Sequence, residues 1–201
     1  MSGLAKMELW AQLLVLIPLG ATLAVAAFTD ARERKVYNWL TYPMFVVGLL
    51  VHTILVGWSG LGWGLLAGLV ALVLGILMLP LGWMGGGDTK LLAVVGAFLG
   101  IQGLGEIFFY SVLCGALLGL TMALINGYLW HMLKRMYVFL RGLVRSVMYS
   151  STAVVEKLEK DPRSHIPFAV AIFAGGVLAW SDAFFAWPNL LEMFLTAYRL
   201  N

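Results

Sequence analysis

Cysteine and charge are both scarce in this sequence. The 201 residues include one cysteine, Cys114, which excludes a disulfide framework and a cysteine-based zinc site. Charged residues make up 11% of the chain and hydrophobic residues 62%, whereas a soluble domain has about 25% charged residues. A chain of this size has too much surface for its volume to hide that excess in a core. The composition therefore excludes a soluble enzyme, a nucleic-acid-binding domain and a disordered chain, and predicts a protein that lies mostly in lipid.

Long uncharged runs follow one another along the chain. A membrane-spanning helix needs about 20 mainly apolar residues. We predict an all-α integral membrane protein that forms a single domain over residues 1–201. Six spans are expected, and the fourth is short enough to need help from its flanks. They run approximately over Leu9–Phe28, Trp39–Val56, Leu61–Trp83, Leu91–Ile101, Ile107–Trp130 and Ile166–Ala183.

A longer polar stretch, residues 131–165, separates the fifth and sixth predicted spans. Between residues 133 and 148 apolar side chains recur at helical spacing, and Lys134, Arg141 and Arg145 fall on the opposite side. This pattern is typical of a helix that lies flat in the membrane interface, with its basic face toward anionic headgroups. We therefore expect an interfacial helix here, and the lipid bilayer as its partner.

Lysine and arginine are distributed unevenly between the two sides of the membrane. Three loops on one face hold all of them except Lys6 and Arg199. These loop residues are Arg32, Arg34, Lys35, Lys90, Lys134, Arg135, Arg141, Arg145, Lys157, Lys160 and Arg163. By the positive-inside rule that face is cytoplasmic and both termini are outside. The expected location is the cytoplasmic (inner) membrane.

Two aspartates stand out among the acidic residues. Asp30 directly follows the first predicted span, and Asp88 ends the run Gly85-Gly86-Gly87-Asp88 before the fourth. The predicted topology puts both at the cytoplasmic boundary. Two carboxyl groups held close together share a proton, so that one can activate a water and the other can polarise a carbonyl. This is the chemistry of an aspartyl protease, and the three glycines are expected to give a non-helical segment that shapes the site.

Other interpretations of these residues stay open at this stage. Asp88 could cap a helix N-terminus, and Asp30 could be a solvated acid that balances Arg32 and Arg34. A small ion- or proton-coupled transporter or channel would also use membrane acids, and a non-catalytic assembly component would need neither aspartate. His52, inside the second span and without an acid there, favours a hydrogen-bonded packing role.

The two aspartate motifs resemble those of the type IV prepilin peptidases, which are membrane aspartyl proteases of the GxGD class. In that family the first catalytic Asp closes a helix and is followed by a basic stretch and then by a Pro-Asn step. Asp30, Arg34 and Asn38 fit this pattern, but Tyr37 stands in place of the proline. The second lies in GxGD with a Lys two positions on, which matches Gly85–Lys90 fully.

A third likeness to the family opens the last span, where Ile166-Pro167-Phe168-Ala169 matches an Ile-Pro-aromatic segment. Presenilin-like GxGD proteases fit less well, because they have a Tyr-Asp step and a Pro-Ala-Leu motif that are absent here. The resemblance implies that Asp30 and Asp88 are catalytic, with supporting roles for Arg34, Asn38, Lys90 and Pro167. It implies no metal and no cofactor.

The resemblance also implies a substrate and a subclass. Longer bacterial members carry two CxxC pairs in a cytoplasmic segment and N-methylate the mature pilin, and this chain has neither CxxC pair. It is therefore similar to the short, protease-only form that serves type IV pili of the tight-adherence kind. The expected activity is removal of the short basic leader from pilin-like precursors at the cytoplasmic face, next to the precursor's apolar helix.

Overall fold

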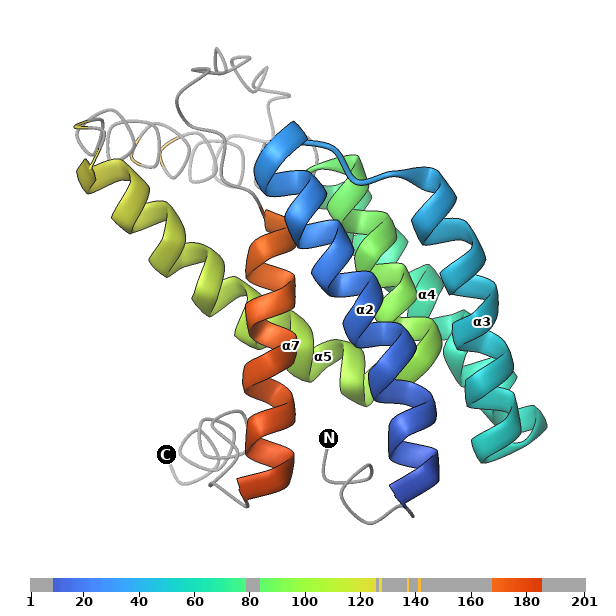
Figure 1. Cartoon of the computed structure of the whole chain (residues 1–201). Coiled ribbons are helices and arrows are strands. Elements are labelled where there is room, and N and C mark those ends of the chain that lie inside the picture. Colours follow the sequence, from blue (N-terminus) through green and yellow to red (C-terminus); the bar gives the residue numbers. More distant parts are fainter. Residues whose placement is uncertain are drawn as a thin grey trace, which may run out of the picture. The chain divides into compact units, whose positions relative to one another are not determined.

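The computed structural model describes residues 9–78, 84–125, 127, 137, 141 and 168–185. These residues are almost entirely helical (Figure 1), and the helices are α2 (Leu9–Glu33), α3 (Asn38–Val56), α4 (Trp58–Met78), α5 (Gly86–Ile125) and α7 (Phe168–Phe185). The chain divides into two compact units, residues 1–115 with 167–201 and residues 116–166. All five helices belong to the first unit, except for the end of α5. The prediction of one domain over the whole chain stays a prediction.

Most of the predicted spans correspond to helices of the structure. Helices α2, α3, α4 and α5 are long and apolar enough to cross a membrane, and α7 contains a shorter apolar stretch, Phe168–Ser181. The all-helical membrane architecture is therefore confirmed. The count of six spans and the outward termini stay predictions. The predicted interfacial helix lies outside the described residues, apart from Tyr137 and Arg141.

The fourth and fifth predicted spans form one element, α5, which is interrupted at Gly100. There the backbone has φ 67° and ψ −168°, and the chain turns back (Figure 1). One turn earlier, His52 Nδ1 of α3 lies 3.3 Å from the Ala97 carbonyl oxygen, to which it donates a hydrogen bond. Carbonyl groups next to a helix end need such partners. His52 thus has the hydrogen-bonded packing role that its sequence context favours.

Replacing Gly100 by alanine is expected to destabilise the protein. Side chains are rarely tolerated at this φ and ψ, where strain costs about 1–3 kcal/mol. A Cβ at residue 100 would also lie 2.9 Å from His52 Cε1. We expect a lower midpoint of thermal unfolding in detergent. The control is Gly62→Ala in α4, because a Cβ at Gly62 meets nothing within 4 Å. Equal unfolding midpoints for the two variants would contradict the expectation.

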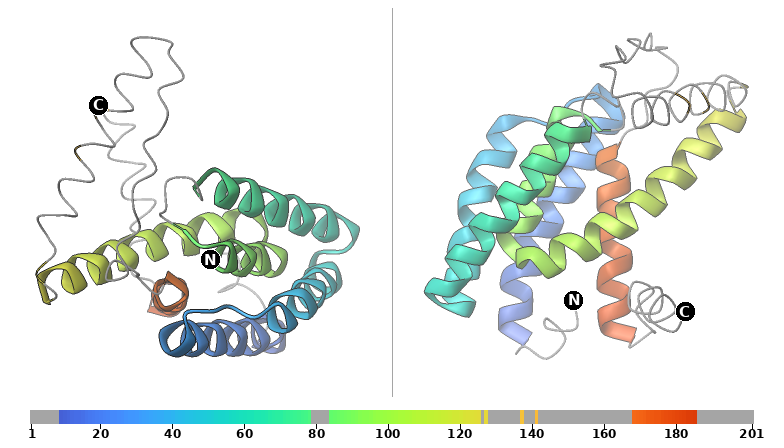
Figure 2. Two further views of the ribbon diagram at one scale, coloured as in Figure 1. Left: turned by 90° about the horizontal axis from the view of Figure 1, so that it is seen from above. Right: turned by 180° about the vertical axis from the view of Figure 1, so that it is seen from behind.

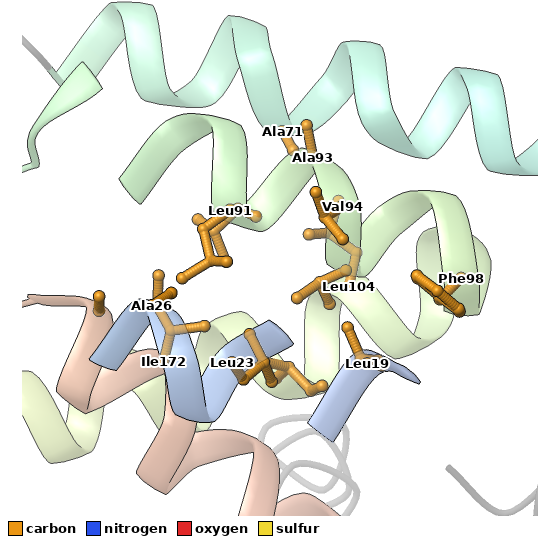
Figure 3. Close-up of a cluster of buried hydrophobic side chains, with 14 of the residues drawn as sticks. Leu19, Leu23, Ala26, Ala71, Leu91, Ala93, Val94, Phe98, Leu104 and Ile172 are labelled. Atoms are coloured by element: carbon orange, nitrogen blue, oxygen red, sulfur yellow. The ribbon is translucent and has the colours of Figure 1, made fainter. Parts of the chain in front are cut away.

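The first segment of α5 lies between the other helices of its unit, as the view from above shows (Figure 2). Leu91, Leu92, Val94 and Val95 are fully or almost fully buried. Figure 3 shows side chains of this segment facing α2, α4 and α7; the facing residues include Leu19, Leu23, Ala26, Ala71 and Ile172. Protein rather than lipid therefore surrounds this segment of α5.

Small residues let α4 and α5 approach closely. A Cβ at Gly96 of α5 would lie 3.0 Å from the Gly68 nitrogen of α4, and one at Gly68 would lie 2.6 Å from the Phe45 ring. Close backbone approach of this kind is typical of helices packed in lipid. The outer faces of the helices instead expose large apolar side chains, among them Leu50, Ile54, Leu69 and Ile76. Both features agree with a membrane protein.

Candidate active site

Asp30 lies inside α2, because the helix continues past Phe28 and ends at Glu33. Its side chain is 6% exposed. The backbone N–H of Ala169, in the first turn of α7, donates a hydrogen bond to Asp30 Oδ2 at 3.2 Å. The first N–H groups of a helix have no partner within the helix and favour negative charge. The start of α7 therefore supplies a site for the Asp30 carboxyl group.

Asp88 is the third residue of α5 and is 8% exposed. The Gly85 N–H donates a hydrogen bond to Asp88 Oδ2 at 3.0 Å, as an acid in the first turn does in a capping box. The expectation of a non-helical triple glycine is therefore wrong in part: Gly85 precedes the helix, but Gly86 and Gly87 are its first two residues. Asp88 performs the capping role and is also held in one orientation by it.

The fold brings the two aspartates to the same end of the helix bundle. They come from α2 and α5, and Val36, in the loop that follows α2, packs against Gly87, the residue before Asp88. The same end carries the start of α7, through its contact with Asp30, and the start of α3, through the contact of its Asn38 with Lys90. Two buried carboxyl groups from distant parts of the sequence thus share one site. Such an arrangement allows one carboxyl group to act as a base on a water and the other to act as an acid on a bound carbonyl.

The glycines around Asp88 have different surroundings. A Cβ at Gly87 would lie 2.9 Å from the Cβ of Val36, in the loop between α2 and α3. One at Gly85 would lie 3.0 Å from Asp88 Oδ2, whereas one at Gly86 would meet nothing within 4 Å. A side chain is therefore least tolerated at the third position of the motif, would press on the Asp88 carboxyl group at the first, and has open space at the second.

Thr89 fixes the other side of this turn. Its hydroxyl donates a hydrogen bond to the Gly85 carbonyl at 3.1 Å. Its side chain packs directly on Gly75 of α4, where a Cβ would overlap it. Contacts with α4 at Thr89 and with the α2–α3 loop at Gly87 thus fix the turn that carries Asp88.

Lys90 connects this turn to α3. Its Nζ donates a hydrogen bond to Asn38 Oδ1 at 2.8 Å and lies 5.4 Å from the centre of the Tyr42 ring. These contacts bring together two of the predicted supporting residues, Asn38 and Lys90. They link α5 to the first turns of α3, so that Lys90 holds two helices together at the site.

Replacing Lys90 by methionine is expected to lower activity at this site about threefold, with little loss of folded protein. Methionine keeps the apolar stem but removes the hydrogen bond, and exposed polar pairs contribute little stability. Asn38→Ala removes the same bond from the other side. The double variant should therefore be no worse than either single variant, as a double-mutant cycle can measure. Additive losses would show that the two side chains act separately.

The remaining predicted residues differ in how the structure places them. Arg34 is exposed and has a left-handed backbone, with φ 56°, and its N–H closes α2 on the Asp30 carbonyl at 2.9 Å. Pro167 lies outside the described residues. Among the residues that the structure describes, no group of three or more His, Cys, Asp or Glu side chains could hold a metal ion.

Three residues that contact the site are not among the predicted ones: Val36, Thr89 and Ala169. Val36 and Thr89 act through packing, which leaves no pattern in the sequence. A signal for Ala169 does exist, because a proline before an apolar run marks a helix start. The sequence places the first N–H groups of the last predicted span at the cytoplasmic membrane boundary, where it also places Asp30.

Comparison with known proteins relates this chain to leader peptidases. The model of the type IV leader peptidase family matches residues 17–120, which include both aspartates. The prepilin leader peptidase/N-methyltransferase of Bacillus subtilis (strain 168) is 35% identical over 120 residues, which cover 57% of this chain and 36% of that protein. The chain thus spans about a third of the length of that curated relative. No solved structure matches the chain significantly.

Proposed function

The chain belongs to the type IV leader peptidase family, and from this premise we propose that it is a membrane-embedded aspartyl endopeptidase. Its proposed substrates are pilin-like precursors, and the bond cut joins their short basic leader to the apolar helix that follows. Asp30 and Asp88 are the proposed catalytic pair. The proposal assigns no role to a metal or a cofactor.

One observation carries this proposal: Asp30 and Asp88 are both buried at one end of the bundle, where the loop after α2 packs against the residue before Asp88. In the proposed reaction the ionised carboxyl group takes a proton from water as the water attacks the scissile carbonyl. The protonated carboxyl group donates a hydrogen bond to the carbonyl oxygen and then gives its proton to the leaving nitrogen. The N–H groups of Gly85 and Ala169 orient the two carboxyl groups for these roles.

The proposed location of the site is the cytoplasmic face of the cytoplasmic membrane. The basic residues Arg32, Arg34, Lys35 and Lys90 lie in the sequence near the two aspartates, and such residues favour the cytoplasmic side. A precursor that rests with its apolar helix in the bilayer would have its basic leader at this face. The six-span topology, with both termini outside, belongs to the same proposal.

Leader removal in membranes tests the function. The full chain would be co-expressed with a precursor that has a short basic leader and an apolar helix, and the product would be analysed by gel mobility and by mass spectrometry of its new N-terminus. We expect a single cut between leader and helix. A precursor made without its leader is the control and should stay unchanged.

The outcome separates this proposal from the transporter interpretation. Membranes that contain the chain at normal levels but leave the precursor intact would contradict the peptidase. A proton or ion flux into liposomes that depends on Asp30 and Asp88 would then support the transporter. Cleavage without such a flux supports the peptidase.

A further inference from the structure

The short loop between α2 and α3, residues 34–37, connects the two halves of the site. It begins one turn after Asp30, and its Val36 packs against Gly87, the residue before Asp88. A change in the path of this loop would therefore move Val36 away from Gly87. The contact between Val36 and Gly87 thus links the end of α2 to the start of α5.

Arg34 and Lys35 of this loop are exposed, whereas Val36 and Tyr37 are half-buried and Val36 packs against the hydrophobic core. Arg34 has a left-handed backbone, which is uncommon for a residue with a side chain. Across the loop, the Tyr37 hydroxyl donates a hydrogen bond to the Glu33 carboxylate, which joins the last residue of α2 to the residue before α3. The Tyr37 ring also lies 6.3 Å from the Trp39 ring, centre to centre.

We propose that Glu33 and Tyr37 are a positioning pair for the catalytic aspartates. Their hydrogen bond closes the loop, keeps Val36 on Gly87 and so holds Asp88 beside Asp30. Neither side chain takes part in the chemistry. This inference rests on the proposed peptidase function.

Two properties of Tyr37 suit this role. The hydrogen bond to Glu33 and the negative charge of that residue raise the pKa of the Tyr37 hydroxyl, so the phenol keeps its proton to a higher pH than a tyrosine without this partner. The Tyr37 backbone, with φ −82° and ψ 138°, also begins α3, because its carbonyl accepts hydrogen bonds from the N–H groups of Leu40 and Thr41. The side chain and the backbone of one residue thus fix the loop at both ends.

The first test separates positioning from folding. Tyr37→Phe and Glu33→Ala each remove the hydrogen bond, and we expect kcat for leader cleavage to fall about fivefold, the effect of one hydrogen bond, with KM unchanged. The double variant should be no slower than either single variant. Tyr137→Phe, at an exposed tyrosine of the other compact unit, is the matched control and should keep the wild-type kcat.

The second test replaces the hydrogen bond by a covalent restraint. Proline fixes φ near −65°, which is close to the −82° of Tyr37, and it lacks an N–H. Within the described residues, the Tyr37 N–H donates no backbone hydrogen bond, so none is lost. We expect Tyr37→Pro to keep most of the wild-type kcat. In the Tyr37→Pro background, Glu33→Ala should no longer lower kcat. A merely local contact of the phenol would not be rescued by proline.

Each result has a definite meaning. If the wild type cuts the precursor and Tyr37→Phe cuts it equally fast, the positioning pair is wrong while the peptidase stands. A Tyr37→Pro variant as slow as Tyr37→Phe, or one in which Glu33→Ala still lowers kcat, also overturns the inference. If the wild type does not cut the precursor, the proposed peptidase function is wrong. The wild-type rate shows this independently of the variants.

Discussion

Asp30→Asn and Asp88→Asn are each expected to lower leader cleavage at least about 100-fold, as the loss of a general acid or base does. Asparagine keeps the size of the side chain and can still accept the N–H of Ala169 or Gly85 through its carbonyl oxygen. It cannot take up or release the proton that hydrolysis requires. The loss should therefore appear in kcat, while the amount of protein in the membrane changes little.

The measurement is the initial rate of precursor cleavage at equal levels of membrane-inserted enzyme. Glu106→Gln is the matched control, since it makes the same acid-to-amide change in α5 beyond the break at Gly100. It should cut at nearly the wild-type rate. Residual cleavage above a few per cent in both aspartate variants would mean that the two carboxyl groups are structural.

The helices, and the position of Asp30 and Asp88 at one end of the bundle, could be predicted from the sequence, because lipid imposes strong rules. Long apolar runs had to become helices, and α2, α3, α4 and α5 are long and apolar enough to cross a membrane. The uneven distribution of lysine and arginine placed Asp30 and Asp88 at one boundary. Both are buried at one end of the bundle, as that reasoning requires.

The contacts that hold the aspartates could not be predicted in the same way. Val36 on Gly87 and Thr89 on Gly75 join residues far apart in the sequence, and packing of this kind has no local signature. The extent of α5 was also missed. Glycine runs disfavour helices, yet α5 begins at Gly86, because Asp88 caps this start and Gly87 packs closely against Val36. Tertiary contacts thus override local preference at this site.

The spacing of the glycines before Asp88 leads to the second large effect. Gly87→Ala is expected to lower cleavage at least about tenfold and to reduce stability by about 1–3 kcal/mol, as overpacking does. The new Cβ would lie 2.9 Å from Val36 Cβ. Val36 is β-branched and short, so it cannot turn away, and the α2–α3 loop has to move instead. That movement separates the two aspartates.

Gly86→Ala is the matched control, one residue away in the same turn. Its Cβ would meet nothing within 4 Å, and alanine is a better helix former than glycine, so this variant should fold and cut the precursor normally. Adding Val36→Ala should not restore the activity of Gly87→Ala, because the new side chain overlaps the Cβ of residue 36, which alanine keeps. Val36→Gly removes that atom. We therefore expect Val36→Gly to recover part of the cleavage lost in Gly87→Ala. Equal activity of Gly86→Ala and Gly87→Ala would show that the contact with Val36 does not hold the site together.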